Sequence, residues 1–179
     1  VITTTQIQNF KSTQVVAFTS DQLAAMDTTQ IAALKTSQIA VLTTAQVQYL
    51  STEQLNNMTT AQVASLTTVT VGALNTAQIA GLSTASIGAL TTGSLSFLTT
   101  AQVVGLTAKQ IAVLSTASVA ALTTNQVSSL TNAQVIALTT AQVAALNTTT
   151  VGALTTGQIS SMQVADVAAL TTASLAALT

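Results

Sequence analysis

Every eighth residue of this chain, from Ile2 to Leu178, is a large apolar side chain, and the series runs through 23 positions without an insertion or a deletion. Five residues after each of these positions up to Leu170 comes a second apolar residue, which is always Val, Ile or Leu. The unit therefore reads roughly Leu-Thr-Thr-Ala-Gln-Val-Ala-Ala. A short period kept over the whole chain predicts a stack of repeats in which each unit contacts only its neighbours.

The start of the unit carries the signals of a helix N-terminus, as the copy from Leu42 to Val47 illustrates. Thr43 precedes Gln46 by three residues, which is the spacing of a capping box. With Thr43 as the N-cap, Leu42 and Val47 stand at the two positions of a hydrophobic staple. We favour this register. The second Thr of the pair, here Thr44, is also nearly always hydroxylated, so a cap one residue later stays open.

Substitutions at the proposed cap position and at the Gln position support this register. Most replacements at the cap position are good N-caps, whereas replacements at the Gln position are small and polar. The cap position holds Asp27, Asn75 and Asn147, with Lys11, Lys35 and Gln163 as exceptions, and the Gln position holds Thr70, Ser86, Ser94, Thr150 and Asp166.

A single long helix or strand cannot accommodate this period. In a continuous helix, eight residues advance about 800°, so equivalent side chains would drift by about 80° per unit. In a continuous strand, two apolar positions five residues apart would point to opposite faces. Within one helix, however, Val47 and Leu50 share a face. The sequence therefore predicts one helix of one or two turns per unit, with a bend at the Thr pair.

One unit cannot fold alone. Burying one Leu and one Val contributes roughly 3 to 6 kcal/mol, while ordering eight residues costs about 12 kcal/mol at about 1.5 each. Stacking must also bury the small residues that follow Val, such as Ala144 and Ala145. We therefore predict an all-α solenoid of very short helices, one per eight-residue repeat, that forms a single continuous array over residues 1–179. The array holds about 22 units, and it begins and ends partway through a unit, so we expect it to be a segment of a longer chain.

The number of units in each coil of the solenoid is harder to infer. Gly72, Gly88 and Gly152 occupy the same position of the unit and differ by multiples of sixteen residues. This spacing favours two units, or 16 residues, per coil, and three units per coil stays open.

Composition excludes several classes of partner. Charged residues make up 4% of the chain and the net charge is −1, so the clustered cations that a nucleic-acid partner requires are missing. Polar Thr-type residues interrupt every apolar run, so we expect no membrane insertion. There is no Cys to report on the redox compartment. The charged residues are Lys11, Lys35, Lys109, Asp21, Asp27, Glu53 and Asp166.

The sequence offers no constellation for catalysis. There is no His and no Cys, and the four carboxylates are well separated, whereas acid–base chemistry needs titratable groups that converge. Asp21 and Asp27 are the closest acidic pair, and we interpret them as a solvated loop carboxylate and an N-cap rather than a metal site. No calcium-binding motif is present. We expect no enzyme, no catalytic residue, no metal site and no cofactor.

Haem ligation is also poorly supported, because the candidate ligands are only Tyr49 and three methionines. The methionines all stand in the Leu position, which indicates core residues, and Tyr49 is interpreted as a partly exposed packing residue. The phenylalanines are expected to thicken the core locally, with an aromatic contact patch as the alternative. The residues concerned are Met26, Met58, Met162, Phe10, Phe18 and Phe97.

Pairs of threonines recur along the whole chain, as at Thr59-Thr60, Thr99-Thr100 and Thr139-Thr140. Their expected role is capping and solvation. The alternative is that evenly spaced hydroxyl and methyl groups form a flat lattice that binds ice, a glycan or a crystalline polysaccharide surface.

The unit from Leu138 to Leu146 resembles the tandem octapeptide tracts of very long bacterial secreted or cell-surface proteins, which are often labelled adhesins or haem-utilisation proteins. The resemblance covers the entire chain and implies an extracellular setting and a scaffold or stalk role. The resulting hypothesis is a structural rod that forms an extracellular filament or an adhesin stalk. Because neither end carries a polar capping unit, we also expect end-to-end self-association.

Overall fold

The computed structural model describes residues 2–178, and within them the chain forms 22 short α-helices, one per eight-residue unit, and no strand. Individual helices contain only four to six residues. This confirms the predicted all-α solenoid. The helices are α1 (Thr4–Asn9), α2 (Ser12–Val16), α3 (Ser20–Ala24), α4 (Thr28–Ala32), α5 (Thr36–Ile39), α6 (Thr44–Tyr49), α7 (Thr52–Asn56), α8 (Thr60–Ser65), α9 (Thr68–Ala73), α10 (Thr76–Gly81), α11 (Thr84–Ala89), α12 (Thr92–Ser96), α13 (Thr100–Gly105), α14 (Ala108–Ala112), α15 (Thr116–Ala120), α16 (Thr124–Ser129), α17 (Asn132–Ile136), α18 (Thr140–Ala145), α19 (Thr148–Val151), α20 (Thr156–Ser161), α21 (Val164–Ala168) and α22 (Thr172–Ala176).

Most helices begin at a capping box, as α6 shows. The N-cap Thr43 has extended backbone angles, φ −82° and ψ 162°, and its hydroxyl accepts from the Gln46 N–H at 3.2 Å. In return, Gln46 Oε1 accepts from the Thr43 N–H at 2.9 Å. These two bonds satisfy N–H groups that have no partner inside the helix. The first Thr of the pair is thus the cap, and the favoured register is confirmed.

Each helix ends at or just before the next Leu position. In α6, the Leu50 N–H donates to the Val47 carbonyl at 3.3 Å, and Leu50 itself is extended, with φ −64° and ψ 133°. The bend therefore lies at Leu50 and the following cap residue Ser51. The predicted bend within the Thr pair is corrected, because the second Thr is already the first helical residue. No residue between 2 and 178 needs a positive φ to make these turns.

The exceptions at the cap position behave as their side chains dictate. Lys11, Lys35 and Gln163 supply no side-chain cap hydrogen bond. At the two lysines, Gln14 and Gln38 still accept from the cap N–H, at 2.8 and 2.6 Å. Half of the capping box is therefore kept where the cap residue cannot accept.

One turn of the solenoid contains more than three units and fewer than four. Each helix packs against the third helix along the chain, as α3 does against α6 and α15 against α18. The hydrogen bonds between coils join residues that are 25 to 31 positions apart, from Ser12 with Ser37 to Gln46 with Val15. Three units span 24 residues and four span 32, so the expected coil of two units, or 16 residues, is wrong.

The glycine spacing misled because it does not reflect the stacking contact. A Cβ added at Gly72 would lie 3.6 Å from the Phe97 carbonyl oxygen, which is 25 residues further along the chain. Another glycine position carries the closer approach: at Gly81, an added Cβ would lie 2.9 Å from the Thr52 methyl group. Small residues after Val do let neighbouring coils approach, but across an offset that no local pattern reveals.

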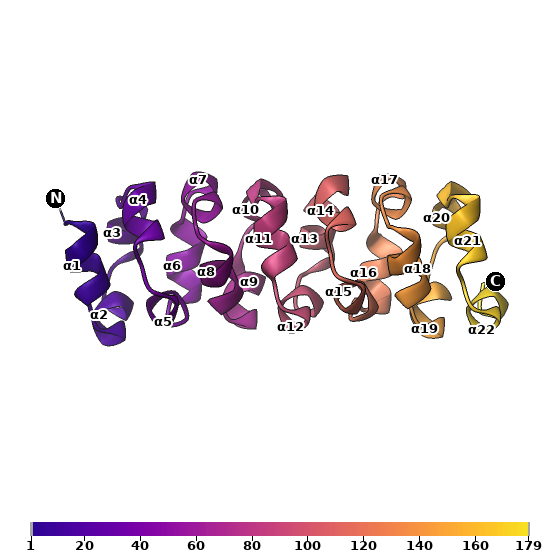
Figure 1. Ribbon diagram of the computed structural model, residues 1–179, viewed down its shortest axis with the longest axis horizontal. Helices are drawn as coiled ribbons and strands as arrows, with labels where there is room; N and C mark the ends of the chain where they lie inside the picture. The colour runs from indigo at the N-terminus through magenta and orange to yellow at the C-terminus, as the bar shows by residue number, and fades with distance from the viewer. Residues whose placement is uncertain (1, 179) are drawn as a thin grey trace.

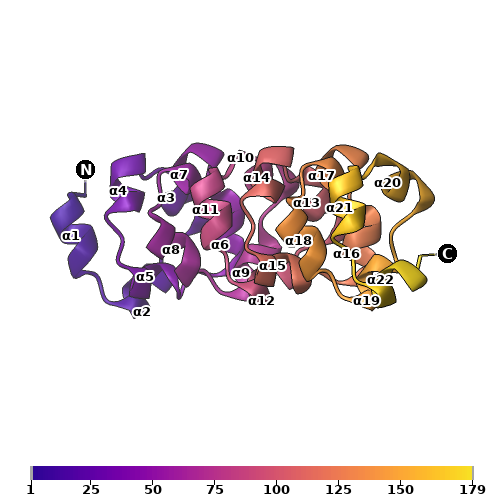
Figure 2. The ribbon, with the colours of Figure 1, turned by 45° about the vertical axis from the view of Figure 1, so that its right-hand side comes forward.

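The coils stack into a straight rod with the two termini at opposite ends (Figure 1). The helices along the upper edge of Figure 1 are α4, α7, α10, α14, α17 and α20, so the step is usually three helices and once four, as a non-integral turn requires. The turned view in Figure 2 shows the same elongated shape. Inside the rod, the Leu and Val positions form one hydrophobic cluster that runs from Ile7 to Leu170.

Candidate functional site

The most specific chemistry of this molecule lies between its coils, at the Gln position. Gln110 is only 2% exposed. Its Oε1 accepts from the Thr107 N–H at 2.7 Å within its own unit. Its Nε2 donates to three carbonyl oxygens of the preceding coil, those of Ile79 at 3.1 Å, Ala80 at 3.2 Å and Leu82 at 2.7 Å. One side chain thus begins one helix and satisfies the end of another, α10.

This second contact explains why a polar side chain is buried in every interior coil. The last carbonyls of a helix have no partner within it, and an unpaired carbonyl beside an apolar core is costly. The glutamine amide supplies the missing donor, because it carries two N–H groups as well as an oxygen. Equivalent bonds between coils are made by Gln38, Gln46, Gln54, Gln62, Gln78, Gln102, Gln126, Gln134, Gln142 and Gln158.

Sequence reasoning found the local half of this arrangement and missed the other. A capping box accepts Glu as readily as Gln, yet no unit has Glu at this position. Glu would keep the oxygen and lose the donor. The absence of Glu is therefore the signal that could have revealed the contact between coils.

Shorter residues at the Gln position do not bridge the coils through an amide. Ser118 bonds to Ser115 of its own unit, at 2.8 Å between the hydroxyls. Asp166 is buried and accepts from the Thr140 hydroxyl of the preceding coil at 2.9 Å. The bridge to the helix carbonyls therefore depends on the length and the amide of glutamine.

The first coil presents the same glutamines without a preceding coil. Gln6, Gln14 and Gln22 are exposed, and among the described residues their bonds are those of their own capping boxes. The Leu-position residues beside them are also uncovered, with Ile2 38% exposed and Phe18 partly exposed. Apolar side chains and amide donors thus lie together on this face.

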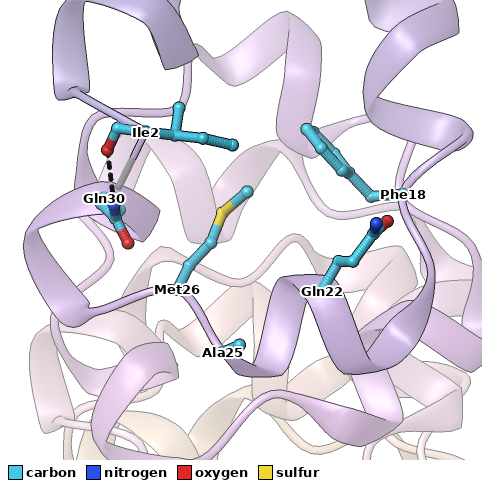
Figure 3. Close-up of a pocket in the computed structure, with 6 residues that line it drawn as sticks. All are labelled: Ile2, Phe18, Gln22, Ala25, Met26 and Gln30. Carbon is cyan, nitrogen blue, oxygen red and sulfur yellow. Dashed lines mark hydrogen bonds between the residues drawn. The ribbon is translucent and has the colours of Figure 1, made fainter.

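Two shallow hollows of about 330 Å³ each open on the first coil. Figure 3 shows the first, in which the Met26 side chain points between Ile2 and Phe18. Gln30 closes one side, because its Nε2 donates to the Ile2 carbonyl at 2.6 Å. Gln22 lies on the opposite side, toward Phe18.

The last coil is uncovered in a complementary way. Interior Val-position residues are essentially fully buried, as Val143 and Val151 are. In the last coil, Ile159 and Leu175 are less covered, with Ile159 partly exposed and Leu175 42% exposed. The first coil therefore exposes the Leu position, and the last coil exposes the Val position.

The aromatic and methionine residues divide between core and surface. Met26 and Met58 are buried as predicted, and Met162 packs against the core. Phe97 is 62% exposed, so the expectation that it thickens the core is wrong. It stands at a small-residue position that faces outward. Phe10 and Phe18 do pack against the core, with ring centroids 5.3 Å apart in a T-shaped pair, while Tyr49 is exposed.

The two closest acidic residues serve the helices that contain or follow them. Asp21 lies in the first turn of α3, not in a loop, and is exposed. Asp27 is the N-cap of α4, as predicted. Hydrogen bonds from the Thr29 hydroxyl, first, and from the Gln30 N–H lower the pKa of Asp27. Between residues 2 and 178, no three His, Cys, Asp or Glu side chains gather as metal ligands. No helix in that range has the length and apolarity to span a bilayer.

The repeated cap, the bridging glutamine and the continuous core define the class of this protein, an α-solenoid built from octapeptide repeats. Comparison with known families matches the ALTTAQ repeat to residues 21–52, 31–68, 71–100, 100–132 and 109–140, which together cover more than half of the chain. The chain belongs to the ALTTAQ repeat family. No curated protein sequence matches it.

Proposed function

We propose that this chain is a structural protein, a solenoid rod that serves as an extracellular filament or as the stalk of an adhesin. The observation that carries the proposal is the single hydrophobic cluster from Ile7 to Leu170, which runs through the stack without interruption. A core continuous along the axis makes the coils one mechanical body, because no coil can rotate or separate without exposing apolar surface.

The bridging glutamines add to the stiffness of this rod. Each bridge joins residues about one coil apart, as Gln62 joins the ends of α4 through the Ile31 and Leu34 carbonyls. Bending the rod would stretch these bonds on one side. Repeated buried bonds of this kind support a spacer that holds its length.

The extracellular setting rests on the resemblance of the units to tandem tracts of bacterial surface proteins. The outer surface is nearly uncharged, with only seven charged residues in 179, and is solvated by hydroxyl and amide groups. Catalysis forms no part of the proposal.

Small-angle X-ray scattering of the purified chain at low concentration tests the rod. The pair-distance distribution should have the long tail of a straight rigid rod, with a maximum dimension equal to the length of the stack. A compact or flexible particle would overturn the proposal. Labelling intact and permeabilised source cells with antibodies against the chain tests the location, and signal only after permeabilisation would refute the extracellular role.

Binding of ice, a glycan or a polysaccharide surface through the threonines is the second candidate. Because a turn contains more than three units and fewer than four, equivalent threonines of successive coils are displaced around the rod and do not form a straight flat row. This geometry favours the structural role. Ice-recrystallisation inhibition and co-sedimentation with crystalline cellulose test the alternative, which would lead if either were positive and were lost on replacing exposed threonines.

A further inference from the structure

We propose that the first coil of one copy docks onto the last coil of a second copy, in register with the repeat, so that rods join head to tail. The inference rests on the proposed rod. Its basis is that the two ends of the molecule are complementary halves of the contact that interior pairs of coils make.

The polar half of the contact consists of donors at one end and acceptors at the other. Gln6, Gln14 and Gln22 use their oxygens in capping boxes, and their Nε2 groups belong to exposed side chains of the first coil. At the far end, no glutamine between residues 2 and 178 reaches the carbonyls at the end of α21. In the interior, these two groups bond to each other, as Gln134 does to the Val103 and Leu106 carbonyls at 2.7 Å.

The apolar half of the contact has the same polarity. Ile2, Phe10 and Phe18 are partly uncovered at the first coil. Ile159 and Leu175 are partly uncovered at the last. In the interior, both positions are buried together, so the surface that covers each end elsewhere in the molecule is a coil of the same repeat. A second copy supplies that coil.

The repeat also fixes the register of docking. Interior glutamines donate to carbonyls 31 and 28 residues earlier, as in the bond of Gln38 to Ile7 and Phe10. If Ile2 of the second copy falls eight residues after Leu178 of the first, all three exposed glutamines find carbonyls. One unit closer, the two copies overlap, and one unit further, the third glutamine has no acceptor. The pairs are Gln6 with Ile159 and Met162, Gln14 with Val167 and Leu170, and Gln22 with Leu175 and Leu178.

This contact joins two different surfaces and repeats along a screw axis, so it does not close. An open contact between unlike surfaces generates a filament. The expected product is a polar filament with the diameter of the single rod.

The first test replaces the three exposed amides by carboxylates, in the variant Gln6→Glu, Gln14→Glu and Gln22→Glu. The capping boxes survive, because Glu fills the same role, whereas the donors are lost and three carboxylates face carbonyls. The critical concentration for assembly, measured by sedimentation and electron microscopy, should rise at least about tenfold. The matched control carries the same added charge on the side of the rod, in Gln48→Glu, Asn125→Asp and Asn132→Asp, and should assemble like the natural chain.

The second test establishes the polarity. Leu175→Glu places a charge on the last coil and should block the other end. Each variant alone should stay monomeric, and an equimolar mixture should form dimers and nothing larger, because one free first coil meets one free last coil. Dimers of either variant alone would contradict head-to-tail docking.

The two proposals fail in different ways. If the natural chain stays monomeric at the highest soluble concentration, or if the three-glutamate variant assembles like its control, the docking inference is wrong, whatever the shape of the monomer. If scattering shows that the dilute monomer is not a rod, the proposed function is wrong. Circular dichroism of each variant confirms that its helices are intact before assembly is compared.

Discussion

The glutamine of each unit connects the sequence signal to the three-dimensional stack. Its oxygen acts three residues away in the chain and its nitrogen acts 28 to 31 residues away, as Gln54 does toward Leu23 and Met26. Only a side chain with both an acceptor and a donor at this length can do both. The same residue therefore specifies where a helix begins and which coil lies beneath it.

The two roles can be separated by one substitution made at two places. Gln126→Glu keeps the cap acceptor but removes the donor to the Leu95, Ser96 and Leu98 carbonyls. A buried charge then faces those carbonyls, and we expect a loss of about 3 kcal/mol in the free energy of unfolding. Gln22→Glu, made where no coil lies beneath, should change it by less than about 0.5 kcal/mol. Chemical denaturation measures both, and equal effects would show that the bridge contributes nothing.

The cap of α4 should make a small contribution to stability that depends on pH. Hydrogen bonds from the Thr29 hydroxyl and the Gln30 N–H hold the pKa of Asp27 below its ordinary value of 3.8. The folded state therefore binds this proton less readily than the unfolded state. The contribution is present above pH 3.8 and is lost as the pH falls through the folded pKa. An NMR titration of the Asp27 carboxyl carbon should give a midpoint below 3.8, and Asp27→Asn should remove the acid-dependent step in α4.

At the residue scale, the sequence allowed the cap to be predicted because both partners lie within one unit. Thr43 and Gln46 are three residues apart in every conformation of the chain. The exposure of Phe97 could not be predicted in this way, since it depends on which coil lies against its helix. Position in the unit was the better guide, because the small-residue position faces outward at Tyr49 as well.

At the scale of the helix, capping matters more here than in longer helices. A helix of four to six residues is too short to be stable by itself in water. Its first N–H groups and last carbonyls make up most of its backbone, and side chains help to satisfy both ends. Stability of these elements therefore comes from caps, bridges and the buried Leu and Val positions together.

Adding a missing cap should stabilise the chain. Lys35 is the N-cap of α5 and makes no side-chain cap bond. Lys35→Thr would supply an acceptor to the Gln38 N–H, and we expect a gain of about 1 kcal/mol in the free energy of unfolding. Lys109→Thr removes the same charge from an exposed position that is not a cap, and it serves as the control. A melting temperature that rises equally in both variants would assign the effect to charge instead.

Helix existence and register were predictable, whereas the order of stacking was not. The bend and the cap repeat every eight residues, so each unit reports its own helix. The packing of α3 against α6 instead depends on small angular changes at each bend, which accumulate over a whole coil. A slight change at the bends would bring different helices together without changing the period of the sequence.

At the scale of the whole molecule, the chain behaves as a linear array. The helices that pack against each other are about one coil apart along the chain. Stability is then a sum of unit terms and contacts between neighbouring coils, and it can be interrupted at one level of the stack. The period without insertions predicted this one-dimensional architecture, because an insertion in any unit would have broken the regular contacts.

The most direct measurement of the stacked core is the thermal unfolding of Leu106→Asp. Leu106 is 4% exposed, lies in mid-stack, and accepts from Gln134 at its carbonyl. Burying a charge there should cost about 3 kcal/mol or more and divide the array into two blocks that melt separately. The control Ala101→Asp places the same charge at an exposed position in α13, the helix that ends just before Leu106. Calorimetry should show a lower, split transition for Leu106→Asp alone, whereas a single unchanged transition would contradict a continuous core at the Leu position.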